Sequence, residues 1–404
     1  MHEILEDLQP VLKERPELVR VFEQLMEPER VIMFRVPWLD DKGDIQVCRG
    51  FRVQFNSALG KAKPPHLGGL RFHPTVNLSI LKFLGFEQIF KNALTGLTMG
   101  GGKGGSDFDP KGASDAEIQR FCQSFMTELS RHIGATTDVP AGDIGVGGRE
   151  IGYLYGQYKR LRNNYEGVLT GKHIPLGGSL MRTQATGYGT VYFANHAVRD
   201  AIGDGQGIGA ANYSTCVVSG SGNVALHAAE KLLQLGAKPI TLSDSSGYVV
   251  QESGFSQEQI NAIKALKASG KARIHEYLSL PEAQGAGAQF VAKEKPWGIK
   301  CDLAFPCATQ NELDGKHAEV LVANGCKGVF EGANMPCSPA AINAFLAAGL
   351  LYGPGKASNA GGVAVSGLEM AQNAAMRRWT ATEVDDMLQV TSTFTVQALA
   401  LAAL

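Results

Sequence analysis

Lys103 lies inside a run of glycines, in the stretch MGGGKGGSDFDP from Met99 to Pro110. Glycine allows backbone conformations that other residues avoid, and it lets a ligand come close to the main chain. A lysine held there in a dry pocket can lose its proton and act as a catalytic group. The same letters also fit a glycine-rich surface turn with a solvated lysine. The sequence therefore predicts a loop and leaves two interpretations of the lysine open.

Polar residues that could accompany this lysine lie on both sides of it. Gln88 and Lys91 are three residues apart near the end of a predicted helix. They could bind one carboxylate together, and they also fit a solvated helix end. Asp138 and Asp143 follow in the glycine-rich segment DVPAGDIGVGG, which is predicted to be a loop. A loop aspartate usually caps a turn, but a second loop of glycines and carboxylates in the same half of the chain favours a site.

The segment that begins at Thr215 has the order of a dinucleotide-binding unit. A strand, the turn GSGNVA, a helix and a second strand follow one another, and the second strand ends at Asp244. Gly220 is expected to make the tight turn, Gly222 to let the pyrophosphate approach, and Ala225 to let the helix pack on the strand. An acidic residue about twenty positions after the glycines completes the pattern. The sequence therefore predicts dinucleotide binding here.

Other elements are predicted from apolar spacing and from capping residues. Two buried strands are expected in CDLAFPCATQNEL and GVFEGANMP, with Asn311 and Asn334 at their ends, where parallel sheets bind ligands; an asparagine in a turn also needs no ligand. Arg49, Arg52 and Gln54 are expected at a sheet edge. The remaining predictions are one or two helices in 1–28, strands at 30–39 and 45–56, helices at 74–90, 150–161 and from 338, and a helix after a capping box of Ser114 and Glu117.

Composition narrows the class of protein. The 404 residues carry a net charge of −1, which argues against nucleic acid or an anionic membrane as the main partner. The seven cysteines form no CxxC pairs and have no histidines at metal-ligand spacing, so we expect reduced thiols and no metal site. No secretory signal, transit peptide or membrane-spanning run is visible. These features are typical of a soluble α/β enzyme of two or three domains.

Long motifs then connect the chain to a known family. It contains, in order, GGLRFHPTVNLSILKFLGFEQIFKN, MGGGKGGSDFDPKG, DVPAGDIGVGGREIGYLYGQYKRL, GVLTGK, ATGYG, SGSGNVA, PCATQNEL, EGANMPC and GPGKASNAGGVAVSGLEMAQN. With these motifs the chain resembles the hexameric, NADP-linked glutamate dehydrogenases of the Glu/Leu/Phe/Val dehydrogenase family. The resemblance implies an α/β fold with two domains around a cleft. Residues 1–185 would bind substrate and form the oligomer, 186–360 would form a Rossmann-like NADP-binding domain, and 361–404 would return to the substrate domain as helices.

The resemblance also implies a reaction and a set of site residues. The reaction is the reversible oxidative deamination of L-glutamate to 2-oxoglutarate and ammonia with NADP. Lys103 would polarise the attacking water or ammonia and Asp143 would move protons. Gln88 and Lys91 would hold the α-carboxylate and Ser366 the γ-carboxylate, with Gly69 and Asn359 also at the substrate. The cofactor would contact Thr186, which orients the nicotinamide amide, and Gly220, Ser221, Gly222, Asn223, Val224, Asp244, Ser245, Asn311 and Asn334.

Departures from the family pattern leave alternatives open. Leu67 stands where the family has a lysine directly before GGLRF, and Pro64 to Leu67 resemble an insertion that displaces Lys63. The chain also ends before the family's usual C-terminal segment. The alternatives are a related amino-acid dehydrogenase with another side-chain preference and a catalytically impaired NADP-binding homologue. The resemblance further implies a cytoplasmic homohexamer, with import into an organelle as the other possible location, and no nucleic-acid or membrane partner.

Overall fold

The computed structural model describes residues 9, 11–58, 64–203, 205–210, 213–268, 270 and 272–402. Contacts within the chain divide it into two units. Unit 1 comprises Met1–Leu180 and Ser366–Thr380, and unit 2 comprises Met181–Val365 and Ala381–Leu404. The terminal segment is therefore split, which differs from the expectation that 361–404 returns as a whole to the substrate domain.

A mixed sheet forms the centre of unit 1, with the strand order β1-β2-β4-β3-β5. The two pairs β1/β2 and β2/β4 are antiparallel, whereas β3 runs parallel to both β4 and β5. Two glycine-rich strands are thus neighbours inside the sheet. The strands are β1 (Arg30–Leu39), β2 (Ile45–Asn56), β3 (His66–Phe72), β4 (Gly100–Ser106) and β5 (Asp138–Gly142).

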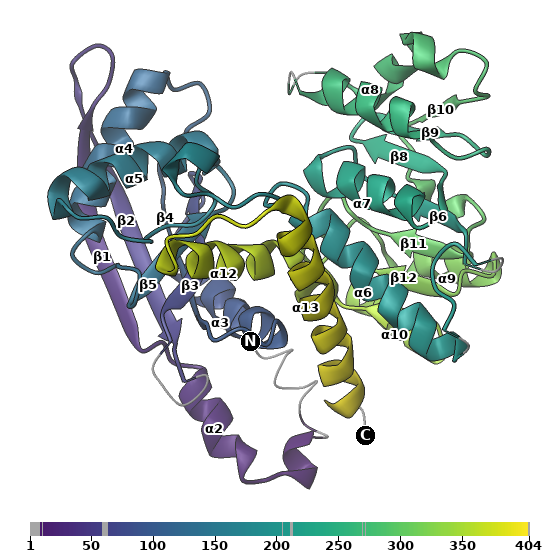
Figure 1. The fold of residues 1–404 in the computed structure, drawn as a ribbon, viewed down its shortest axis with the longest axis horizontal. Helices are drawn as coiled ribbons and strands as arrows, with labels where there is room; N and C mark the ends of the chain where they lie inside the picture. The colour runs from purple at the N-terminus through teal and green to yellow at the C-terminus, as the bar shows by residue number, and fades with distance from the viewer. Residues whose placement is uncertain are drawn as a thin grey trace. The chain divides into compact units, whose positions relative to one another are not determined.

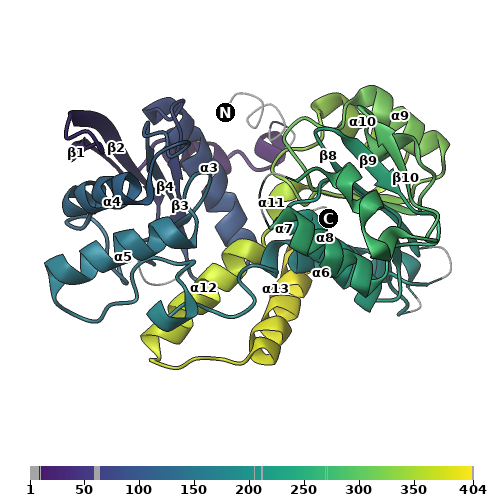
Figure 2. The ribbon, with the colours of Figure 1, turned by 90° about the horizontal axis from the view of Figure 1, so that it is seen from above.

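Helices cover both faces of this sheet (Figures 1 and 2). An aromatic cluster packs α4 and α5 on one face, and a second cluster packs α3 on the other face. The capping box of Ser114 and Glu117 at the start of α4 confirms its prediction. The start of α3 differs from the prediction at Pro74, because the Asn77 side chain accepts a hydrogen bond from the Ile80 N–H and caps the helix there. The helical elements with residues in unit 1 are α2 (Leu18–Leu25), α3 (Leu78–Leu94), α4 (Asp115–Leu129), α5 (Gly148–Arg162), η1 (Ile174–Leu176) and α12 (Gly361–Ala374), the last beginning in unit 2.

The lysine-bearing stretch is a buried strand, β4, so the prediction of a loop is wrong. Its glycines let neighbouring backbone come unusually close. A Cβ atom at Gly101 would lie 2.7 Å from the backbone nitrogen of Ile89 in α3, and one at Gly104 would lie 2.8 Å from the carbonyl oxygen of Phe51 in β2. The absence of side chains therefore allows α3 to rest directly on β4.

Arg52 and Asp138 form a buried ion pair within the same sheet. Arg52 of β2 and Asp138 of β5 each have a side-chain exposure of 0%. The Nε atom of Arg52 donates to Asp138 Oδ2 at 2.8 Å, and Gln54 Nε2 donates to the same oxygen at 3.0 Å. The expectation that Arg52 and Gln54 lie at a sheet edge is wrong, because β2 is an inner strand. Asp138 likewise begins a strand and is not part of a loop.

Unit 2 is built on a parallel sheet with the order β13-β12-β11-β6-β7, and a small antiparallel sheet, β10-β9-β8, continues it. The helices α9 and α10 pack on one face, while α7 contacts β6 and α6 contacts β13 (Figure 2). The strands are β6 (Thr215–Val218), β7 (Lys238–Pro239), β8 (Thr241–Asp244), β9 (Gly247–Val250), β10 (Gln289–Ala292), β11 (Leu303–Phe305), β12 (Gly328–Phe330) and β13 (Leu351–Gly353). The helices are α6 (Ala185–Ile202), α7 (Asn223–Gln234), α8 (Gln257–Lys267), α9 (Gly315–Ala323), α10 (Pro339–Ala347), α11 (Gly355–Ser358) and α13 (Ala381–Ala402), with short helices η2 (Ile274–Ser279), η3 (Pro281–Ala283) and η4 (Pro296–Gly298).

Candidate active site

Lys103 and Asp143 meet in unit 1. The Nζ atom of Lys103 lies 3.1 Å from Asp143 Oδ2, and the lysine side chain is only 8% exposed. Strand β4 turns the lysine toward α3, where a Cβ atom at Gly85 would lie 3.6 Å from the Lys103 Cβ atom. Burial lowers the pKa of the Lys103 ammonium, although the nearby Asp143 carboxylate opposes part of that effect. The pair therefore combines a lysine that gives up its proton easily with a carboxylate beside it.

Gly69 of β3 provides the space for this pair. A Cβ atom at position 69 would lie 2.7 Å from the Cβ atom of Asp143 and 3.2 Å from Lys103 Nζ. These close contacts are the reason why position 69 requires glycine. Its backbone has an ordinary strand conformation, which any residue could adopt. The contacts place Gly69 directly against both Lys103 and Asp143.

Replacing Gly69 with alanine is expected to push Lys103 and Asp143 apart. The new methyl group would overpack a buried site, which typically costs about 1–3 kcal/mol of stability. We expect a lower urea midpoint together with a clear loss of catalytic rate. Gly156→Ala is the matched control, because a Cβ atom there meets nothing within 4 Å and alanine favours helix formation. Full activity in Gly69→Ala would contradict this role.

Arg71 is a site residue that the sequence analysis missed. It lies two positions after Gly69 on β3, so its side chain is on the same face of the strand. Its Nε atom donates to Asp143 Oδ2 at 2.8 Å. Burial alone would raise the pKa of Asp143, but the charges of Lys103 and Arg71 outweigh burial and lower it. The sequence signal that could have indicated Arg71 is the spacing G-x-R within the GGLRF motif.

Gln88 is held in place by a buried asparagine, which the sequence analysis also missed. The Nε2 atom of Gln88 donates to Asn92 Oδ1 at 2.7 Å. The Nδ2 atom of Asn92 in turn donates to the carbonyl oxygens of Leu67 at 3.0 Å and Gly100 at 2.7 Å. Lys91 lies next to Asn92 in the last turn of α3. This network ties the carboxylate-binding candidates of α3 to the two glycine strands.

The other substrate candidates of unit 1 are less directly placed. Ser366 is buried in α12, and its neighbour Gly367 packs against Met99, immediately before β4. The side chain of Leu67 is fully buried, and its backbone pairs with β4 in the sheet. Lys61 and Lys63, which could replace the family lysine, lie outside the described residues.

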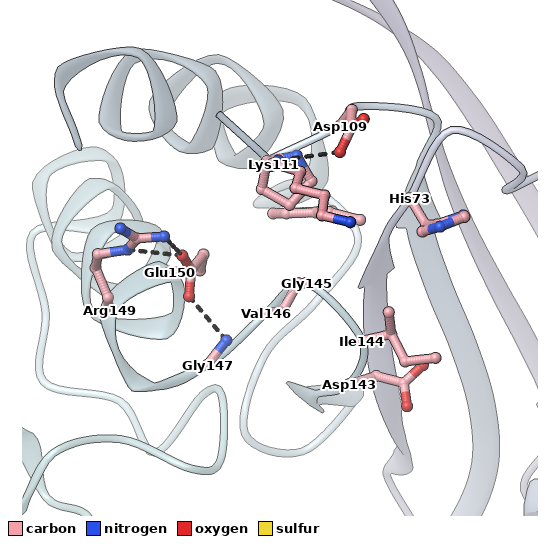
Figure 3. A pocket seen from close by; sticks show the side chains of 12 residues that line it. His73, Asp109, Lys111, Asp143, Ile144, Gly145, Val146, Gly147, Arg149 and Glu150 are labelled. Atoms are coloured by element: carbon pink, nitrogen blue, oxygen red, sulfur yellow. Dashed lines mark hydrogen bonds and ion pairs between the residues drawn. The ribbon is translucent and has the colours of Figure 1, made fainter. Parts of the chain in front are cut away.

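A hollow of about 670 Å³ borders Asp143 on the solvent side (Figure 3). Figure 3 shows Asp143 and Ile144 on one side and the start of α5 on the other. There, Arg149 donates to Glu150 Oε1 at 2.8 Å, and Glu150 Oε2 accepts from the N–H of Gly147 at 2.8 Å. These polar groups on the α5 side of the hollow satisfy one another.

In unit 2 the turn GSGNVA connects β6 to α7. Gly220 has a φ of +91°, which favours glycine, and Gly222 is the N-cap of α7. No side chain caps this helix start, and a Cβ atom at Gly222 would meet nothing within 4 Å. Free N–H groups at an open helix N-terminus suit a phosphate. Ser221, Asn223 and Val224 complete the turn.

Thr186 lies near this turn because α6 packs closely on α7. The Nδ2 atom of Asn223 donates to the carbonyl oxygen of Thr183 at 2.6 Å, just before α6. A Cβ atom at Gly187 would lie 2.6 Å from the carbonyl oxygen of Val224. The start of α6, with Thr186 in its first turn, is therefore held beside the phosphate turn.

Asp244 at the end of β8 is already fully bonded. Its Oδ1 atom accepts from the N–H of Ser246 at 2.9 Å and from the hydroxyl of the same residue at 2.6 Å. Its Oδ2 atom accepts from Lys267 Nζ at 3.0 Å and from the N–H of Ile274 at 2.7 Å. Partial burial would raise the pKa of Asp244, but these bonds lower it to about 2. Next to it, Arg273 Nη1 donates to Ser245 Oγ at 2.8 Å, so two cations surround the end of β8.

Three asparagines lie beyond the ends of sheet strands: Asn311 follows β11, Asn334 follows β12, and Asn359 caps α11, which follows β13. Asn359 Nδ2 donates to Asn334 Oδ1 at 2.9 Å, and the N–H of Asn311 donates to the Met335 carbonyl at 2.9 Å. The buried Oδ1 atom of Asn359 has no hydrogen-bond partner among the residues the structure describes. The structure therefore brings Asn311, Asn334 and Asn359 to one edge of the unit 2 sheet.

Comparison with known proteins gives the family. The model of the Glutamate/Leucine/Phenylalanine/Valine dehydrogenase family matches residues 177–403, and that of the Glu/Leu/Phe/Val dehydrogenase dimerisation domain matches residues 28–160. The chain belongs to this family. It is 58% identical over 393 residues to the NADP-specific glutamate dehydrogenase of Chlorella sorokiniana, covering 96% of this chain and 72% of that one.

Solved structures of relatives share the fold. A glutamate dehydrogenase of Plasmodium falciparum is 56% identical, with a TM-score of 0.91, covering 98% of this chain and 81% of that one. A hetero-hexameric glutamate dehydrogenase from Thermus thermophilus in a Leu-bound form is 25% identical, with a TM-score of 0.82 and coverage of 98% and 90%. The expected α/β fold class, with an N-terminal α/β domain and a Rossmann-like dinucleotide-binding domain, is confirmed.

Three further findings concern metal binding, membrane-spanning helices and the cysteines of this dehydrogenase-family chain. Within the described ranges, no group of three or more His, Cys, Asp and Glu side chains could hold a metal ion. No helix in that part of the chain is long and apolar enough to cross a membrane. All seven cysteines are free thiols.

Proposed function

We propose that the protein is an NADP-dependent glutamate dehydrogenase, which reversibly converts L-glutamate to 2-oxoglutarate and ammonia. The observation that carries this proposal is the buried pair of Lys103 and Asp143, whose Nζ and Oδ2 atoms are 3.1 Å apart on the glycine strands. The NADP-specific enzyme from Chlorella sorokiniana, at 58% identity, supports both substrate and cofactor. The active unit is therefore an oxidoreductase that acts on an amino acid.

The two acid–base groups have complementary tasks in this reaction. NADP held by the turn of unit 2 would supply the acceptor for the hydride that leaves the substrate Cα atom. The iminium group that remains on the substrate is positive, and a neutral Lys103 can help water to attack it without repulsion. Asp143 carries protons between the amine, the water and the lysine. Burial lowers the pKa of the Lys103 ammonium, which suits a group that must lose its proton during the reaction.

Substrate is held by residues on α3, β3 and α12. Gln88 and Lys91 bind the α-carboxylate, and Ser366 binds the γ-carboxylate. Gly69 lies against the reacting carbon, and Asn359 contacts the amino-acid end of the substrate. The orientation of Gln88 by Asn92, through the 2.7 Å hydrogen bond, supports its assignment.

The cofactor is held by unit 2. Gly220, Ser221, Gly222, Asn223 and Val224 surround the pyrophosphate, while Thr186, Asn311 and Asn334 contact the nicotinamide half. The negative charge of Asp244 is paired with Lys267 and both of its oxygens accept hydrogen bonds, so it repels a 2′-phosphate less than a free carboxylate would. Ser245, with Lys267 and Arg273 beside it, fits that phosphate.

Replacing Arg273 with glutamine is expected to weaken NADP binding selectively. A hydrogen bond to a charged group contributes about 1.5–3 kcal/mol, or roughly 10- to 150-fold in affinity. The KM for NADP should rise by that order, while the KM for glutamate stays unchanged. Arg199→Gln, at the far end of α6, is the control. An unchanged KM for NADP in Arg273→Gln would exclude Arg273 from the phosphate site.

We further propose a homohexamer that assembles through β1. This strand is at the edge of its sheet, and the face it shares with β2 exposes Met33 by 66%, Ile45 by 74% and Val47 by 60%. An exposed apolar edge strand offers unpaired backbone groups and apolar surface to another chain. The dimerisation-domain model covers this strand, and the related Thermus enzyme is a hetero-hexamer, which supports six subunits. The free thiols support a cytoplasmic location.

The proposed function is tested by assaying the purified protein with glutamate, leucine, valine and norvaline, each with NADP and with NAD. The expected result is reduced cofactor formed with glutamate and NADP, and far less with the apolar amino acids. Leucine or valine turnover above glutamate turnover would overturn the substrate assignment. Light scattering during gel filtration measures the subunit number in the same preparation.

A further inference from the structure

Asp143 presents its two carboxylate oxygens to different surroundings. Both Lys103 Nζ, at 3.1 Å, and Arg71 Nε, at 2.8 Å, contact Oδ2. Within the described part of the chain, no hydrogen bond or ion pair reaches Oδ1. The two cations therefore fix the carboxylate through one oxygen and leave the other for proton exchange.

The position of Arg71 is fixed by the sheet. Arg71 pairs with Gly105 of β4, and a Cβ atom at Gly105 would lie 2.1 Å from the Arg71 carbonyl oxygen. The side chains of Arg71 and Asp143 are 20% and 19% exposed. An arginine that is anchored by its strand and partly shielded from water is well placed to act on its neighbour through charge.

The two cations differ in what they do during the reaction. Lys103 must become neutral to assist the attack of water, and at that moment its attraction for Asp143 disappears. The guanidinium group of Arg71 remains charged at every working pH. A carboxylate that was buried beside a neutral amine alone would tend to take up a proton.

We propose that Arg71 is a positioning residue, which keeps Asp143 ionised and oriented through Oδ2 after Lys103 has released its proton. This inference rests on the proposed function. The other charged groups near Asp143 do not share the task. Arg52, from β2, is committed to Asp138, and Arg149, from α5, is committed to Asp115 and Glu150. His73 and Lys111 line the hollow beside Asp143 (Figure 3) and make no bond to its carboxylate.

The test compares Arg71→Gln and Arg71→Lys with the wild type over a range of pH. Arg71 lowers the pKa of both Lys103 and Asp143, so its removal raises both. The ascending limb of the kcat profile should move to higher pH in Arg71→Gln, and kcat at neutral pH should fall at least about 10-fold. Arg71→Lys, which keeps the charge, should recover part of both effects. Arg49→Gln is the matched control, because Arg49 forms an exposed pair with Asp107 in the same unit.

A second measurement does not depend on turnover. Lysines are methylated with a ¹³C label, the Lys103 signal is identified by its loss in Lys103→Met, and its titration is followed by NMR. A midpoint that is higher in Arg71→Gln than in the wild type supports the proposal. An unchanged midpoint overturns the proposal. A kcat that falls with no shift of its ascending limb along the pH axis overturns it as well. If the wild type does not oxidise glutamate, the proposed function fails, and the NMR titration still decides the role of Arg71.

Discussion

Replacing Lys103 with alanine is expected to lower kcat for glutamate oxidation by roughly 10²- to 10⁴-fold, the range that one acid–base group typically contributes. The variant loses the amine that assists the attack of water, while Gln88 and the cofactor turn are untouched. The KM for NADP should therefore stay close to that of the wild type. Steady-state kinetics at saturating NADP measure both quantities.

The pH dependence of the wild type should carry the signature of the same lysine. Burial lowers the pKa of Lys103, so activity should rise with pH through a midpoint below the 10.5 of an exposed lysine. In Lys103→Ala this rise should vanish. Lys111→Ala, a lysine that lines the hollow near Asp143, is the control and should keep both rate and profile. Unchanged activity in Lys103→Ala would refute the acid–base role.

Replacing Asp138 with alanine is expected to lower the stability of unit 1 by about 3–5 kcal/mol. The change leaves the fully buried guanidinium group of Arg52 without its carboxylate, and an uncompensated buried charge has a cost of that order. It also removes the acceptor of the Gln54 side chain. Urea unfolding followed by fluorescence should give a markedly lower midpoint.

Two comparisons make the test of Asp138 specific. Asp107→Ala breaks an ion pair whose Arg49 side chain is 66% exposed, so it should change stability by about 1 kcal/mol or less. The double variant Arg52→Met, Asp138→Leu removes both charges and should recover part of the loss. A similar midpoint for Asp138→Ala and Asp107→Ala would show that the buried pair does not stabilise the unit.

Local chemistry made several elements predictable. A serine followed three residues later by glutamate caps a helix whatever surrounds it, and the Ser114 capping box is where the sequence predicts it. The dinucleotide unit is also local, because its glycines, helix and second strand follow within some thirty residues. Its last strand ends at Asp244 as predicted. What could not be predicted is that Asp244 bonds to Lys267 and Ile274, which a separate segment brings to it.

The lysine strand and its surroundings depend on contacts between distant parts of the chain. Glycine has a low propensity for strands, so the letters GGGKGG alone indicate a loop. The segment is a strand because β2 and β3 flank it in the sheet. Arg52 and Asp138 are 86 positions apart, and only the sheet order pairs them. Arg71 lies in the motif GGLRF, but the carboxylate of Asp143 that it binds is 72 positions away in the sequence. Long-range pairing therefore decides the details that matter for catalysis.

The glycines of β4 also have a thermodynamic consequence for the enzyme. Glycine loses more conformational freedom on folding than any other residue, and five of the seven residues of this strand are glycine. The strand has almost no side chains whose burial could offset that entropy, so its order must come from the sheet and from α3. Rigidity at the catalytic lysine is thus supplied by its neighbours, and loosening α3 or β3 should loosen Lys103 with them.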